Sequence, residues 1–195
     1  MSSPGYFDRL YQQPDPFQYR SRWYEARKRA LTLACLPRQR FGSAWEVGCS
    51  NGVFTAELAV RCDALLGTDL SAVALASAAV STRAWPHVSL QQACHPGDWP
   101  TGRFDLIVAS EVGYYLPPAV LPEFAAKLRG SLTGDGLLVA CHWLHPFDEA
   151  LASTEHVHRE LSNGLIEAFA YRDADMLLQG WSAGPLSVAQ REGLR

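Results

Sequence analysis

Several features that would place this chain in a special class are absent from its 195 residues. Its five cysteines form no Cys-x-x-Cys pair, and Met1 to Tyr6 lacks the charged-then-apolar order of a secretory signal. An odd number of cysteines without a signal predicts free thiols in a reducing, cytoplasmic environment. No apolar run approaches the length of a membrane span, so no membrane association is expected. There is also no internal repeat.

An excess of positive charge is missing as well. The formal net charge is −3, which argues against a nucleic acid or an anionic membrane as partner and leaves a small molecule as the expected one. Arginines are concentrated before residue 41, where a solvated helix face explains them better than a phosphate contact. With 48% apolar and 19% charged residues, the chain has the composition of an ordinary globule. Nothing in the sequence predicts the oligomeric state.

Strand and helix signals alternate from residue 43 onward. Strands are expected at 43–47, 63–69, 88–92, 103–110 and 137–142, with helices at 53–62, 71–84 and 119–131. After a helix at 154–162, two strands at 165–171 and 176–181 form a hairpin. We therefore predict an α/β fold: a doubly wound, mostly parallel seven-stranded sheet with an antiparallel C-terminal hairpin.

The alternation and the segments on either side of it define three predicted regions. Residues 1–42 form an N-terminal helical segment covering the active site, with Ser21 capping a helix that runs to about Leu36. Residues 43–182 form the main domain. Residues 183–195 form a loosely held tail, because they contain two glycines, a proline and few apolar anchors.

The stretch from Glu46 to Phe54 is the strongest functional signal. An apolar run ends in an acidic residue, turns through Gly48 and Gly52, and opens into a helical pattern, as strands do around nucleotide-like cofactors. The glycines let the backbone approach a ligand closely. A carboxylate at Glu46 would repel phosphate but accept hydrogen bonds from hydroxyls or an ammonium. This favours S-adenosylmethionine over a nicotinamide dinucleotide.

The next strand ends in Asp69, which lies 23 residues after Glu46. A carboxylate there can accept two hydrogen bonds from a ribose diol, and we prefer this role to that of a helix N-cap because Ser71 already fills the latter. Leu70 and His95 are candidates to flank an adenine ring, although a histidine before Pro96 can also be simply exposed in a loop.

Polar residues at the ends of the fourth and fifth strands are the acceptor-side candidates, because ligands bind at carboxyl ends of strands in such sheets. Glu111 and His142 are candidate bases or orienting groups. Two alternatives stand beside them: Glu111 as a loop-pinning residue and His142 as a buried, hydrogen-bonded histidine. The predicted substrate-binding residues are Tyr19, Tyr24, Tyr114, Tyr115 and His145. The histidine spacings match no zinc motif, so no metal site is predicted.

Six segments in order carry a resemblance to a known family: 15–17, 23–25, 46–55, 104–108, 110–116 and 132–139. With them the chain resembles class I S-adenosylmethionine-dependent methyltransferases, and among these the NodS-like group. The resemblance implies a Rossmann-like methyltransferase fold and methylation of an amine or hydroxyl of a small molecule. For the NodS-like group it further implies N-methylation of an amino sugar or a chitooligosaccharide-like acceptor.

The chain departs from the family pattern at two places. Ser50 replaces the middle glycine of the turn, which is tolerable if its φ is negative. The acidic residue that usually meets the adenine amino group is missing, and Cys94 or His95 stands near its place. The predicted cofactor-binding set is Glu46, Gly48, Cys49, Ser50, Gly52, Asp69, Leu70, Cys94 and His95. A nicotinamide-dependent oxidoreductase and a non-catalytic, cofactor-binding member of the fold remain as alternatives.

Overall fold

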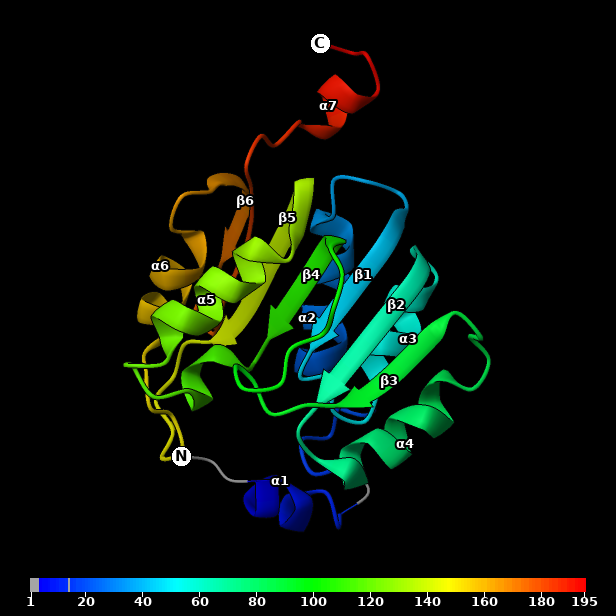
Figure 1. The fold of residues 1–195 in the computed structure, drawn as a ribbon, viewed down its shortest axis with the longest axis vertical. Coiled ribbons are helices and arrows are strands. Elements are labelled where there is room, and N and C mark those ends of the chain that lie inside the picture. The colour runs from blue at the N-terminus through cyan, green and yellow to red at the C-terminus, as the bar shows by residue number, and fades with distance from the viewer. Residues whose placement is uncertain (1–3, 14) are drawn as a thin grey trace.

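The computed structural model describes residues 4–13 and 15–195 and contains one seven-stranded sheet. The strands are β1 (Phe41–Val47), β2 (Cys62–Asp69), β3 (Val88–Gln92), β4 (Phe104–Ser110), β5 (Leu132–Trp143), β6 (Ile166–Arg172) and β7 (Met176–Ser182). They lie in the order β3-β2-β1-β4-β5-β7-β6 (Figure 1). All pairs up to β5 are parallel, and β7 runs antiparallel to both β5 and β6. The predicted fold class and terminal hairpin are confirmed.

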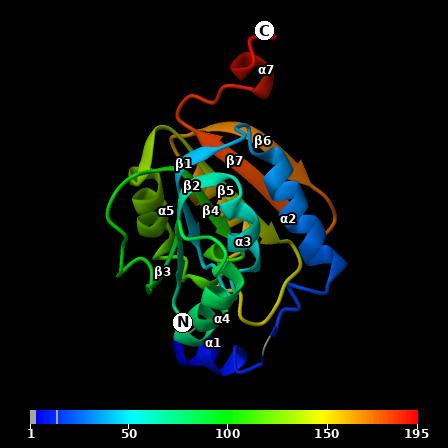
Figure 2. The ribbon, with the colours of Figure 1, turned by 90° about the vertical axis from the view of Figure 1, so that its right-hand side faces the viewer.

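Helices cover both faces of the sheet. They are α1 (Pro4–Leu10), α2 (Trp23–Cys35), α3 (Val53–Ala59), α4 (Ala72–Thr82), α5 (Leu121–Gly130), α6 (Thr154–Ser162) and α7 (Val188–Arg191), with a 3-10 turn, η1 (Gly113–Tyr115). Figure 2 shows α2 and α3 on one side of the sheet and α5 on the other. Residues 106–109 of strand β4 are all apolar and buried, because both faces of the strand are covered in this way.

Each face of the sheet has its own apolar core. Trp45, Phe124 and Leu138 belong to the core under α5 and α6, and Phe41 and Leu58 to the core under α2 and α3. These five side chains are at most 1% exposed. The two cores hold the central strands rigidly, so the carboxyl ends of β1, β4 and β5 form a fixed platform.

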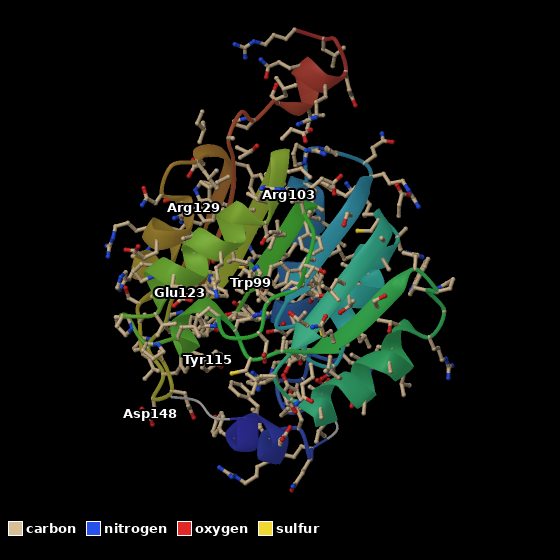
Figure 3. The ribbon with its side chains drawn as sticks, viewed as in Figure 1. Trp99, Arg103, Tyr115, Glu123, Arg129 and Asp148 are labelled. Atoms are coloured by element: carbon tan, nitrogen blue, oxygen red, sulfur yellow. The ribbon has the colours of Figure 1, made fainter. Side chains whose placement is uncertain are left out.

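Helix α1 lies at the carboxyl edge of the sheet, beside α4 (Figure 1). Phe7 and Tyr11 pack there with Ala74, and the ring of Phe7 meets Tyr115 edge-on at 5.2 Å between centroids. In Figure 3 Tyr115 lies between the sheet edge and α1. The N-terminal segment therefore contributes a wall to whatever lies at this edge.

One sequence-based expectation about local structure was wrong. Arg22, not Ser21, is the N-cap of α2, and it makes no side-chain capping bond. No helix was predicted between β3 and β4, and the structure has none there; Trp99 covers the sheet, 5.1 Å from Trp45 between ring centroids. The tail contains a short helix, α7, with a capping box at Ser187, and Figure 1 shows it projecting from the body. Pro14 lies outside the described residues.

Candidate functional site

The turn between β1 and α3 is built from left-handed backbone. Gly48 has φ +72°, and a Cβ there would lie 2.4 Å from Cγ2 of Val112. Gly52 has φ +74°, and a Cβ there would lie 2.7 Å from the Cα of Ala78. Both positions thus need glycine, for conformation and for space. Ser50 is also left-handed, with φ +51°, so the condition of a negative φ, under which serine would be tolerable here, is not met.

Contacts to neighbouring elements hold Ser50 in this conformation. Its amide donates to Oδ2 of Asp69 at 2.9 Å, and its Oγ accepts from Oη of Tyr11 at 2.6 Å. The other oxygen of Asp69 accepts from the amide of Ser71 at 2.9 Å, while the Ser71 hydroxyl caps α4 as predicted. Burial raises the pKa of Asp69, although these backbone N–H groups favour its charged form. The loop and the carboxylate therefore form one preorganised unit.

Glu46 lies at the end of β1 and is 4% exposed. Its Oε2 has no hydrogen-bond partner among the described residues. Burial raises its pKa to about 8. An unpartnered buried carboxyl oxygen beside a glycine turn fits a ligand that brings a hydrogen-bond donor, such as the ammonium of S-adenosylmethionine. The tight glycine cradle and this orphaned oxygen are what the predicted donor requires.

A cavity of about 800 Å³ opens at the carboxyl edge of the sheet. One end is lined by Asp69, Leu70, Cys94 and His95, and the other by Tyr24, Glu111, Tyr114 and Trp143. This volume is within the range of ligand sites in proteins. A small cavity of about 40 Å³ shares Gly48 and Ser50 with it.

Most of the predicted site residues meet at these cavities. The predicted residues that line the large cavity are Tyr19, Tyr24, Gly48, Ser50, Asp69, Leu70, Cys94, His95, Glu111, Tyr114 and Tyr115. Glu46 and Cys49 line only the small one. Gly52, His142 and His145 line neither. Gly52 shapes the turn from behind, where it packs on α4.

His95 is held in place rather than exposed in its loop. Its Nε2 lies 2.9 Å from Oγ1 of Thr68, and its Nδ1 lies 2.8 Å from the carbonyl of Asp98. The ring meets Trp45 edge-on at 5.3 Å between centroids. Burial lowers its pKa, so the ring is neutral at pH 7. A neutral, fixed ring at the wall is consistent with the predicted place beside an adenine.

A charged cluster lies at the other end of the cavity. Lys28, on α2, has its Nζ 2.8 Å from Oε1 of Glu111 and 3.1 Å from Oε2 of Glu25. Oε2 of Glu111 accepts from the hydroxyl of Tyr114 and, at 3.1 Å, from the amide of Trp143. Burial opposes the charge on Lys28, but the two carboxylates outweigh it and raise the pKa of the lysine. The cluster carries a net charge of about −1.

Sequence reasoning missed Lys28. It is one of only two lysines in the chain, and its spacing from Glu25 fits an ordinary helical ion pair. Its partner Glu111 is 83 positions away, so only the fold brings them together. The same holds for Tyr11, whose bond to Ser50 joins α1 to the glycine turn.

His142 is fully buried, at 0% exposure. Its Nε2 accepts from the amide of Gly113 at 3.1 Å, and its Nδ1 lies 3.0 Å from Nε2 of His158. Both ring nitrogens are therefore occupied, which favours the alternative of a buried, hydrogen-bonded histidine over a base. His145 is half exposed and does not line the cavity, although its partner Asp175, at 2.9 Å, does.

Comparisons with known proteins bear on this site. The family model "Nodulation protein S (NodS)" matches residues 6–137. Nodulation protein S of Bradyrhizobium diazoefficiens is 35% identical over 116 residues, which are 59% of this chain and 54% of that protein. The chain thus matches about half the length of this curated relative.

Solved structures extend the similarity over most of the chain. A protein of Pseudomonas syringae, with methyltransferase as its suggested function, is 42% identical, with 83% of this chain and 99% of that chain covered and a TM-score of 0.74. N-methyltransferase NodS from Bradyrhizobium japonicum, in complex with S-adenosyl-L-homocysteine, is 26% identical, with 89% and 94% covered and a TM-score of 0.81. Among the described residues, no helix is long and apolar enough to cross a membrane.

Proposed function

Because the chain belongs to the nodulation protein S (NodS) family, we propose that it is an S-adenosylmethionine-dependent methyltransferase acting on an amine or hydroxyl of a small molecule. The observation that carries the proposal is the single cavity that joins the Asp69 end to the Glu111 end. A donor and an acceptor can meet in it over the carboxyl ends of β1 and β4. With a net charge of −3, a small molecule suits the protein better than a nucleic acid.

The donor end contains the groups that the cofactor needs. When bound, S-adenosylmethionine supplies a methyl group on a positively charged sulfur. Gly48 to Gly52 would hold its methionine and ribose portions, with Asp69 accepting from the ribose hydroxyls. Glu46 would accept from the ammonium, which would favour the charged form of a carboxyl whose pKa is otherwise raised by burial. Leu70, Cys94 and His95 would enclose the adenine.

An amine is the acceptor that the other end suits best. The Glu25–Lys28–Glu111 cluster has one cation for two carboxylates, so it attracts a further positive charge. A carboxylate has about four lone-pair sites, and Glu111 uses three of them on Lys28, Tyr114 and Trp143. The fourth, on Oε1, is left to orient an N–H of the acceptor. Methyl transfer then depends mainly on alignment and on exclusion of water.

The finer part of the proposal is that the acceptor is an amino sugar or a chitooligosaccharide-like molecule. It is supported by the N-methyltransferase NodS of Bradyrhizobium japonicum, which this chain resembles at 26% identity. Tyr24, Tyr115, Trp143 and Phe147 line the acceptor end with aromatic rings. Such rings offer apolar faces to the C–H side of a sugar together with polar edges. The five free thiols suit a reducing compartment, so we place the reaction in the cytoplasm.

Two measurements test the proposal. Calorimetry is expected to show binding of S-adenosylhomocysteine and none of NAD; the reverse would establish the oxidoreductase alternative. Labelled methyl transfer to a panel of amino sugars and other amines is expected for the wild type. It should fall at least about 100-fold in Asp69→Asn, because a ribose carboxylate is lost. Exposed Asp148→Asn, whose side chain is labelled in Figure 3, is the control. Tight donor binding with no transfer to any acceptor would favour the non-catalytic alternative.

A further inference from the structure

We propose that His142 and His158 are positioning residues: a one-way hydrogen-bond chain fixes both as neutral Nδ1–H tautomers and so sets the place of the η1 turn at the acceptor end. The chain runs from the Gly113 amide to His142 (3.1 Å), to His158 (3.0 Å), to Gln179 (2.8 Å) and to Glu167 (2.7 Å). The role in methyl transfer rests on the proposed function; the tautomers do not.

The two ends of the hydrogen-bond chain determine its direction. A backbone amide such as that of Gly113 can only donate, so Nε2 of His142 must accept and carries no proton. At the other end the carboxylate of Glu167 accepts from Nε2 of Gln179, which turns Oε1 of Gln179 towards His158. Oε1 can only accept, so Nδ1 of His158 donates.

The middle bond follows from both ends. Nδ1 of His158 holds its proton, so in the neutral ring Nε2 is free to accept. Nδ1 of His142 then donates to it, which agrees with the assignment reached from Gly113. Each of the four bonds has one proton. A further proton on either ring would place two donors face to face within the chain.

The burial of the pair is consistent with this. His142 is 0% exposed and His158 is 3% exposed. Burial, as the largest cause, lowers the pKa of His142 well below its usual value and that of His158 to about 4. The ring planes lie at 78° to one another, so the nitrogens meet edge to edge and the rings do not stack.

The hydrogen-bond chain ends at the η1 turn, which contributes to the acceptor end of the cavity. Gly113 opens η1, and the next two residues, Tyr114 and Tyr115, are part of the cavity wall. Tyr114 donates to Glu111, so its position also sets that of the carboxylate. From the other side the Tyr114 carbonyl accepts from the amide of Leu151 at 2.7 Å. The histidine chain thus holds the turn from one side, and none of its members lines the cavity.

The decisive experiment is on the intact wild-type protein. Two-bond ¹H–¹⁵N correlation spectra at pH 7 should show His142 and His158, assigned by substitution, as neutral rings protonated at Nδ1. Free histidine prefers the Nε2–H form, so this is a distinctive signature. A ring protonated at Nε2, or doubly protonated, would overturn the proposal. This readout needs no methyl acceptor, so it is independent of the proposed activity.

Kinetics test the positioning role. His158→Leu removes the acceptor for His142, and kcat for methyl transfer should fall about 10-fold while the Kd of S-adenosylhomocysteine stays within about 2-fold. His158→Gln, whose Oε1 can still accept, should recover most of kcat. The matched control is His156→Leu, on the same helix but paired with Glu160 outside the chain. Equal kcat in His158→Leu and His156→Leu would refute the role.

Discussion

Replacing Lys28 with methionine should strongly destabilise the protein. The Lys28 side chain is 6% exposed, and those of its partners Glu25 and Glu111 are 10% and 16% exposed. At the 2.8 Å that separates Nζ of Lys28 from Glu111, the attraction is about 6 kcal/mol at an effective dielectric of about 20. Desolvation of the lysine offsets part of this. Removing one partner of a buried pair costs about 3–5 kcal/mol in general.

The expected cost in this cluster is at the lower end, about 3 kcal/mol. Burial, the largest cause, already raises the pKa of Glu25, so this carboxyl can take up a proton when the lysine is gone. The pKa of Lys28 is itself raised, so its contribution is fully present at neutral pH and below. It is lost as pH rises through that raised pKa, which puts the loss in the alkaline range.

Urea unfolding followed by tryptophan fluorescence measures this cost, with the slope compared between variants. Lys127→Met, which removes the chain's other lysine from a more exposed pair with Glu123, should cost less than about 1 kcal/mol. Adding Glu25→Gln to Lys28→Met should recover about half of the loss, since one uncompensated carboxylate is removed. Equal costs for the two lysines would show that the buried cluster contributes no special stability, and the reasoning would fail.

Three further predictions concern residues in the cavity wall or packed behind it. Folded wild-type protein keeps the proton on the Glu46 carboxyl to higher pH than the unfolded chain does, so its stability should fall as pH rises from 4.5 to about 8. Glu46→Gln should remove this fall, and urea unfolding across that pH range measures the free energy of unfolding of both proteins. Tyr11→Phe should weaken S-adenosylhomocysteine binding by about 5-fold in calorimetry, since Ser50 loses the hydrogen bond that fixes it. Gly113→Ala should cost about 1–3 kcal/mol in thermal unfolding, because its Cβ would lie 2.3 Å from Cγ1 of Val157; Val157→Ala should restore most of this, and an unchanged Tm in the single variant would contradict the geometry.

The fold was predictable because its signals are local. Buried parallel strands are nearly continuous apolar runs, and residues 106–109 show this without knowledge of their neighbours. The turn between β1 and α3 has its glycines where left-handed backbone needs them. The covering of the sheet by Trp99 between β3 and β4 had no such signal, because it depends on contacts to Trp45 and Ser131 that lie far apart in sequence.

The candidate site was predictable in its location and less so in its roles. Carboxyl ends of strands are known from the strand pattern, so Asp69, Glu111 and His142 could be placed at one edge. Which way each side chain faces depends on partners elsewhere in the chain. His142 turns into the core to meet His158 on α6, whereas Lys28 on α2 reaches Glu111. A polar residue at a strand end has the same sequence signature in both cases.

Backbone conformation separates Glu111 from His142 where the sequence treats them alike. Glu111 has φ +58°, although its side chain carries the Cβ that makes this region costly by about 1 kcal/mol or more. The amide of Glu111 is tied to the carbonyl of Cys141 at 2.8 Å, and its carboxylate is held by partners from α2, η1 and β5. A glycine would relieve the strain but would leave Lys28 without this partner. The strain is thus offset by the contacts that hold the carboxylate in the cavity wall, which makes Glu111 the stronger acceptor-side candidate.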